Sequence, residues 1–132
     1  MTVTIRPIDQ SDALDWLRLR NAIWEGEDHE REIAAFFRGE LEEPVQVLLA
    51  VNARGEAVAH VELSLRLDVP GLEGFRTGYI EGMYICPNYR KTGVALCLLR
   101  AAEQWAKQQD CAAFASDRED RVVVHSRFRR AA

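Results

Sequence analysis

The most constraining feature of the sequence is a long amphipathic helix pattern that follows a strand pattern and a short polar connection. Apolar residues recur at helical spacing over residues 94–107, which predicts a helix with one apolar face. Residues 79–85 predict the strand, and residues 86–92, with Pro87 and Asn88, predict the connection. This arrangement indicates a domain in which helices pack around one sheet.

The rest of the chain supplies further strand and helix patterns. A helix ends near residue 24, with Asp9, Ser11 and Asp12 as capping residues at its start. Strands are predicted at residues 2–5, 45–51, 56–67 and 111–115, and further helices at 28–41 and 118–130. The 132 residues suffice for one domain of the α/β or α+β class.

Charge and composition narrow the functional classes. The net charge of −4 disfavours nucleic acid as the main partner and is compatible with a cationic substrate. No apolar run reaches the roughly 18–20 residues that cross a bilayer, so no membrane association is expected. The three cysteines form no disulfide framework, which favours a cytoplasmic location, and the three histidines lack the spacing of metal ligands.

The connection between the strand and the long helix carries the clearest chemical signal. It reads Arg-Lys-Thr-Gly-Val-Ala at residues 90–95. A helix start presents backbone N–H groups and partial positive charge, and Gly93 lets a ligand approach closely, so the segment predicts a diphosphate site. Taken alone, a glycine at this position is equally typical of a tight turn.

The pattern Arg-x-x-Gly-x-Ala after a strand resembles the acetyl-CoA signature of the GNAT N-acetyltransferases, and the order of elements is similar to that superfamily. The sequence has neither the Walker pattern GxxxxGK[ST] nor the dinucleotide pattern GxGxxG. The resemblance implies one acetyltransferase domain over residues 1–132. It also implies a central mixed, mainly antiparallel sheet flanked by helices.

Three segments resemble the aminoglycoside 6′-N-acetyltransferases within that superfamily. They are Leu-Arg-Asn-Ala-Ile-Trp at residues 19–24, Ile-Glu-Gly-Met-Tyr-Ile at 80–85, and Ala-Ser-Asp at 115–117. The resemblance implies direct transfer of an acetyl group from acetyl-CoA to an amine of the antibiotic, with no metal.

The resemblance also implies roles for individual residues. Trp24, Glu27, Glu81 and Asp117 match substrate-binding positions, and Glu81 and Asp117 are the catalytic candidates. The backbone of Met83, Tyr84 and Ile85 matches the strand that pairs with the pantetheine arm. The pyrophosphate loop comprises Arg90, Lys91, Thr92, Gly93, Val94, Ala95 and Leu96.

Structural roles compete with each of these assignments. Trp24 is also typical of a core or rim aromatic, and Asp117 is equally typical of a cap for the last helix. Glu81 lies in an apolar strand, so its carboxylate must be paired or must reach a cleft. The acidic run around Glu27 is also typical of a solvated helix start.

The resemblance ends after residue 117, where the superfamily continues with a helix and a last pair of strands. The sequence predicts a short helix instead and no closing strands, so we expect a domain truncated at its C-terminal end. A homodimer is expected, because two-fold assembly is common and a partner can complete the sheet. Two other functions stay open: acetyl transfer to another amine (a polyamine, a metabolite or a protein N-terminus), and CoA binding without catalysis.

Overall fold

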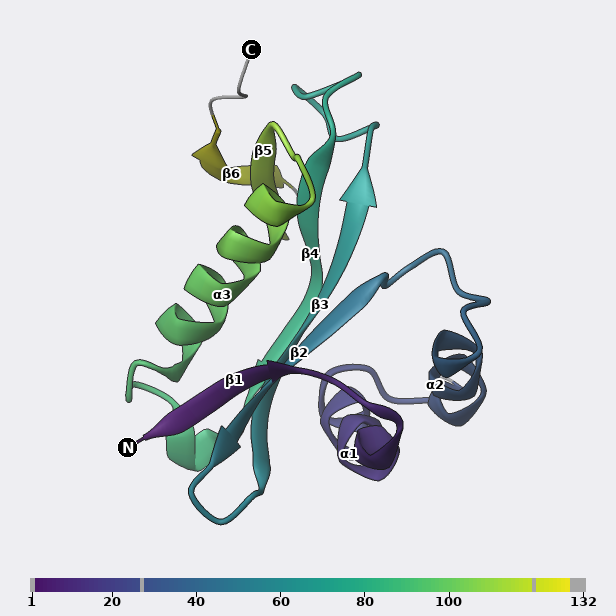
Figure 1. The fold of residues 1–132 in the computed structure, drawn as a ribbon, viewed down its shortest axis with the longest axis vertical. Helices are drawn as coiled ribbons and strands as arrows, with labels where there is room; N and C mark the ends of the chain where they lie inside the picture. The colour runs from purple at the N-terminus through teal and green to yellow at the C-terminus, as the bar shows by residue number, and fades with distance from the viewer. Residues whose placement is uncertain (1, 27, 120, 129–132) are drawn as a thin grey trace.

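The computed structural model describes residues 2–26, 28–119 and 121–128, and it contains one sheet with helices on both sides (Figure 1). The strands are β1 (Val3–Pro7), β2 (Gln46–Asn52), β3 (Ala57–Arg66), β4 (Thr77–Ile85), β5 (Ala113–Arg118) and β6 (Arg121–Arg127). The helices are α1 (Ala13–Ile23), α2 (His29–Phe37) and α3 (Val94–Gln108), with short 3-10 turns at Gln10–Asp12 and Pro87–Tyr89.

The six strands lie in the order β1-β2-β3-β4-β5-β6. Only β4 and β5 run parallel, and every other neighbouring pair is antiparallel. This arrangement confirms the expected mixed, mainly antiparallel sheet. The α3 helix connects β4 to β5, as a crossover between parallel strands requires.

The two faces of the sheet are buried under different helices. Because side chains alternate along a strand, Leu48 and Ala50 of β2 pack beneath α3, whereas Val47 and Leu49 pack with Trp16 of α1. In Figure 1, α3 lies along one side of the sheet and α1 and α2 lie on the other. The sheet is therefore the middle layer of the molecule.

The start of the first helical segment follows the sequence prediction. The Asp9 side chain accepts a hydrogen bond from the Ser11 amide at 2.8 Å, and the Asp9 amide donates to Asp12 Oδ2 at 2.9 Å. This reciprocal pair satisfies two backbone donors that a helix start leaves free. All three predicted capping residues therefore take part.

The predicted last helix at residues 118–130 is wrong, because residues 121–127 form β6 along the edge of β5. Val122, Val123 and Val124 are β-branched, which costs them rotamer freedom in a helix and favours a pleated strand. Glu119 has a φ of 56°, so the chain reverses there rather than continuing as a helix. One closing strand is present where the sequence indicated none.

Among the described residues, no helix is long and apolar enough to span a bilayer.

Gly78 sets how closely α3 approaches β4. A Cβ at this position would lie 2.6 Å from the Cβ of Ala106 on α3. Ala106 is completely buried, so neither backbone can move without disturbing the core. A glycine here therefore fixes the distance between the helix and the strand.

We predict that Gly78→Ala lowers the free energy of unfolding by about 1–3 kcal/mol, because the added methyl overpacks the core. Urea denaturation measures this change. Ala106→Gly removes the methyl group that Gly78→Ala would strike, so the clash is absent in the double variant. The double variant should therefore lose less stability than the two single variants added together. Additive losses would show that the contact does not limit packing.

Candidate active site

The centre of the site is the place where β4 and β5 part. Residues 77–80 of β4 pair with residues 113–116 of β5, whereas residues 82–85 pair only with β3. The Cys86 amide donates to Val58 O of β3 at 2.9 Å. Since hydrogen-bonding direction alternates along an antiparallel strand, the N–H groups of Met83 and Ile85 point to the open edge. That edge can pair with an extended ligand.

A hollow of about 450 Å³ lies beside this open edge. It is lined by Ile80, Glu81, Gly82, Met83, Leu99, Ser116, Asp117, Arg118, Val123 and His125. Ser116 Oγ and His125 Nε2 lie 2.7 Å apart, within hydrogen-bond distance. Burial lowers the pKa of His125 below its ordinary value, and nearby Glu103 offsets only part of this effect. The imidazole is therefore neutral at neutral pH.

A β-bulge places Glu81 between this hollow and a second pocket. Glu62 of β3 faces Gly82 and Leu63 faces Ile80, so Glu81 has no residue opposite it on β3. Bulges of this kind re-aim a side chain and are frequent beside active sites. Glu81 lines both cavities as a result.

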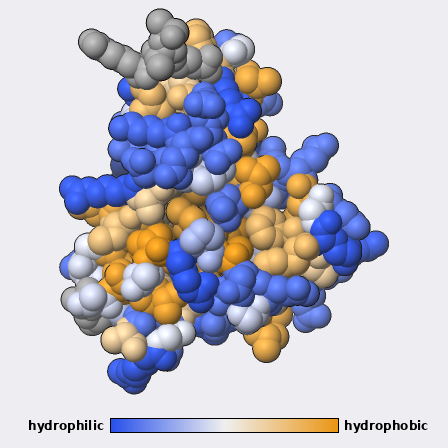
Figure 2. Space-filling view, in the orientation of Figure 1, coloured by the Kyte–Doolittle hydropathy of each residue, from blue (hydrophilic) through white to orange (hydrophobic). Residues whose placement is uncertain are grey.

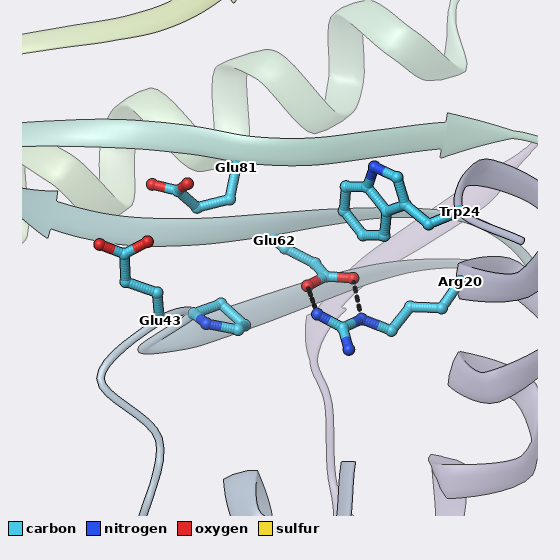
Figure 3. A pocket seen from close by; sticks show the side chains of 6 residues that line it. Arg20, Trp24, Glu43, Glu62 and Glu81 are labelled. Carbon is cyan, nitrogen blue, oxygen red and sulfur yellow. Dashed lines mark hydrogen bonds and ion pairs between the residues drawn. The ribbon is translucent and has the colours of Figure 1, made fainter. Parts of the chain in front are cut away.

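The second pocket has a volume of about 190 Å³ and is acidic. Its lining residues are Arg20, Trp24, Glu43, Pro44, Glu62 and Glu81. Figure 3 shows the carboxylates of Glu43 and Glu81 directed into the same space, while Glu62 faces Arg20. Glu43 and Glu81, at the mouth of the pocket, are therefore separated from Glu62 at its base.

Glu62 forms the base of this pocket and is held by three side chains. Arg20 binds both of its carboxylate oxygens, at 2.9 and 3.0 Å, and Trp16 and His60 each donate to Oε2 at 3.0 Å. Burial raises the pKa of Glu62, but the hydrogen bonds from His60 and Arg20 outweigh it and hold the pKa at about 2. Glu62 is therefore ionised, and its negative charge is balanced by Arg20.

Glu81 and Glu43 share a different cation, Arg66, at the end of β3. Arg66 binds the two oxygens of Glu81 at 2.8 and 2.6 Å and approaches Glu43 at 3.4 Å. Its guanidinium lies over the ring of Tyr79, 4.4 Å from the centroid, and the Tyr79 hydroxyl donates to Asp117. Burial and the contact with Asp117 raise the pKa of Tyr79, so the phenol stays protonated.

Trp24 ends α1 and reaches the pocket because of Gly82. A Cβ at Gly82 would overlap the indole ring of Trp24, so only glycine permits this close approach. The guanidinium of Arg20 lies 5.4 Å from the centre of the same ring. Trp24 is thus both packed on the sheet and exposed to the pocket.

The start of α3 forms the predicted anion-binding segment. The first hydrogen bond within the helix runs from the Cys97 amide to Gly93 O at 3.1 Å, so the amides of residues 93–96 have no acceptor inside the helix. Lys91 and Gly93 have φ values of 63° and 90°, which turn the loop tightly around this end. Figure 2 shows apolar side chains gathered on the surface over the N-terminal half of α3, where Leu96 is exposed.

The structure brings four of the predicted site residues to the two cavities, whereas Tyr84, Ile85 and residues 90–96 line neither of them. Trp24 and Glu81 line the acidic pocket, and Glu81, Met83 and Asp117 line the hollow. Asp117 caps no helix, because a strand follows it. Asp28 lies in the acidic run that the sequence analysis also considered a solvated helix start. Its side chain accepts a hydrogen bond from the Arg31 amide and caps the start of α2. Glu27 lies outside the described residues.

Several participants in the two cavities were missed by the sequence analysis. Arg66 and Tyr79 belong to strands whose alternation signals only burial, so nothing in the sequence indicated that they would contact Glu81 and Asp117. The Ser116–His125 pair depends on β6, which the sequence analysis predicted as a helix. The run of three valines at residues 122–124 was the available signal for that strand.

Among residues 2–26, 28–119 and 121–128, no group of three or more His, Cys, Asp or Glu side chains could hold a metal ion.

The sequence pattern of the acetyltransferase (GNAT) family matches residues 12–130. The chain belongs to this family. Two relatives named aminoglycoside N(6')-acetyltransferase type 1 are each 37% identical to it. The alignment with the Klebsiella aerogenes relative covers 86% of this chain and 76% of the relative. For the Acinetobacter haemolyticus relative, the shares are 96% and 88%.

Solved GNAT structures share the fold. An aminoglycoside antibiotic 6'-N-acetyltransferase from Acinetobacter baumannii is similar, with a TM-score of 0.78 and 33% identity over 89% of this chain and 80% of that one. A structure of AAC(6')-Iy in complex with the bisubstrate analogue CoA-S-monomethyl-acetylneamine has the same TM-score and coverage at 25% identity. GNAT proteins of this fold are thus known with CoA bound.

The low pKa of Glu62 predicts how stability depends on pH. A carboxyl whose pKa falls from 4.5 to about 2 on folding stabilises the protein above pH 4.5, and this contribution is lost as the pH falls toward 2. We predict that Glu62→Gln lowers the free energy of unfolding at pH 7 by about 3 kcal/mol. Urea denaturation at several pH values measures the difference.

The difference between wild type and Glu62→Gln should shrink steadily below pH 4.5. Glu40→Gln is the control, because Glu40 is an exposed partner of Arg38 and its loss should change stability little. A difference that stays constant down to pH 2 would contradict the assignment of an ionised, paired Glu62.

Proposed function

We propose that this protein transfers the acetyl group of acetyl-CoA to the 6′-amine of an aminoglycoside by direct attack. One observation carries the proposal: Glu81 lines both the acidic pocket and the hollow along the open edge of β4. An amine held in the pocket and a thioester held in the hollow therefore meet at one residue. The relatives named aminoglycoside N(6')-acetyltransferase support the choice of substrate.

The carrier side of the site is formed by the start of α3 and by β4. The free amides of residues 93–96 bind the diphosphate, and Arg90 and Lys91 add positive charge beside them. Thr92 closes the loop through a hydrogen bond from Oγ1 to Tyr89 O. The outward N–H of Ile85 and C=O of Met83 pair with the pantetheine arm, which leaves the Met83 N–H for the acetyl carbonyl, while the backbone groups of Tyr84 bind β3.

The substrate side is formed by the acidic pocket. Trp24 supplies an apolar wall for a sugar ring, and Glu81 and Glu43 attract the ammonium groups of the substrate. Asp117 lines the hollow together with Glu81. A polycation is the ligand that this distribution of carboxylates fits.

The reaction needs proton transfers as well as positioning. The neutral amine attacks the thioester carbonyl, a C–N bond forms, and the C–S bond breaks to release the thiolate. A carboxylate, Asp117 or Glu81, accepts the amine proton directly or through water. The Met83 N–H stabilises the developing oxyanion, and Ser116 offers a hydroxyl to the departing sulfur.

Homodimer formation and a cytoplasmic location stay predictions from the sequence. Another amine as the natural acceptor is the alternative function, and it differs only in what occupies the acidic pocket.

A direct assay separates these functions. Acetyl-CoA with kanamycin or tobramycin should release free thiol and give a mono-acetylated antibiotic by mass spectrometry. Turnover with spermidine or small metabolite amines but with no aminoglycoside would favour the alternative. Folded protein that binds acetyl-CoA and turns over neither group of amines would overturn catalysis.

Glu81→Gln should raise the KM for the antibiotic about tenfold and leave the KM for acetyl-CoA within about twofold. A charge-assisted hydrogen bond of about 1.5–3 kcal/mol is lost on the substrate side only. Steady-state kinetics with each substrate varied in turn measures the two values, and Glu40→Gln serves as the control. A rise confined to acetyl-CoA would refute the assignment of Glu81.

Gly93→Ala should show the opposite pattern. Gly93 has a φ of 90°, which a side chain disfavours, so the amides at the start of α3 are displaced from the diphosphate. We predict a rise in the KM for acetyl-CoA of about fivefold or more, for a backbone penalty on the order of 1 kcal/mol. An unchanged value would place the diphosphate elsewhere.

A further inference from the structure

The acidic pocket already contains a cation that belongs to the protein. Arg66 binds both oxygens of Glu81 and reaches Glu43, so one guanidinium occupies the position between the two carboxylates at the pocket mouth. An ammonium group of a substrate would form its ion pairs in the same space. One of the two carboxylate charges at the pocket mouth is therefore balanced before any substrate arrives.

The two arginines of this region differ in how firmly they are held. The Arg20 side chain is 7% exposed and is bound by Glu62 and Glu32, whereas that of Arg66 is 30% exposed at the end of β3. Arg66 lies beside the loop over residues 67–76 and can turn toward solvent. The Glu81 side chain that it leaves is 17% exposed and lines two cavities, so a substrate cation can pair with it there. Arg20 cannot turn toward solvent, because Glu62 would then be buried and unpaired.

We propose that Arg66 is an internal competitor for the substrate and sets the charge that a substrate must carry. This inference rests on the proposed function. Arg66 leaves Glu81 when a substrate binds, and the cost of breaking its ion pairs is subtracted from the affinity. Because Arg66 contacts two carboxylates at once, the ligand that replaces it best offers two ammonium groups, one for Glu81 and one for Glu43.

The opposite role for Arg66 makes the opposite prediction. If Arg66 only holds Glu81 in a productive orientation, its loss weakens substrate binding. If Arg66 competes, its loss strengthens binding. The sign of the change in KM therefore decides between the two roles.

The experiment compares Arg66→Gln, Arg66→Lys and Arg54→Gln with the wild type in the kanamycin assay. We expect Arg66→Gln to lower the KM for kanamycin about fivefold, because an ion pair of this exposure contributes about 1 kcal/mol. The KM for acetyl-CoA should stay within about twofold. Arg66→Lys keeps the charge but loses the bidentate geometry, so its KM should fall between those of Arg66→Gln and wild type.

Arg54→Gln controls for net charge. Arg54 is 85% exposed on the β2–β3 turn and makes only a 3.9 Å contact with Glu56, so the variant removes the same charge away from the pocket. Its KM for kanamycin should equal that of the wild type. A raised KM in Arg66→Gln, or an equal fall in Arg54→Gln, would overturn the inference.

Binding by calorimetry distinguishes failure of this inference from failure of the proposed function. If the wild type neither acetylates nor binds kanamycin, the aminoglycoside assignment fails. Spermidine, a polycation of unrelated shape, then tests Arg66 by itself. Tighter binding of spermidine by Arg66→Gln than by wild type supports the competitor role, and equal or weaker binding contradicts it.

Discussion

The parting of β4 and β5 is the constraint on which the rest of the structure depends. Residues 77–80 of β4 pair with β5, and residues 82–85, after the bulge at Glu81, pair with β3 alone. An unpaired strand edge inside a sheet carries donors and acceptors that need partners. The same opening lies beside the start of α3, so an extended ligand with a diphosphate at one end can satisfy both groups of free amides.

The bulge at Glu81 connects this opening to the acidic pocket on the other face of the sheet. The two ion pairs beside this bulge have different roles. The buried Arg20–Glu62 pair fixes the end of α1 and with it Trp24, whereas the more exposed Arg66–Glu81 pair is positioned where a substrate cation would bind. One ion pair builds the pocket, and the other regulates access to it.

The sequence predicted the fold up to residue 117 because its signals there are local. The periodicity of α3, the caps at Asp9 and Asp12 and the glycine at 93 each act within a few residues. The prediction of a helix was wrong at β6. There a run of valines lies among polar residues, and it forms a strand only by pairing with β5. Arg66 and Tyr79 could not be found for the same reason, since their contacts join residues 15 and 38 positions apart.

The most direct measurement is a crystal structure of the protein with CoA and kanamycin bound together. The account predicts that the diphosphate contacts the amides of residues 93–96, that the pantetheine arm lies along Met83 and Ile85, and that an antibiotic ammonium contacts Glu81 in place of Arg66. A diphosphate bound elsewhere, or an antibiotic outside the pocket formed by Trp24, Glu43 and Glu81, would contradict it.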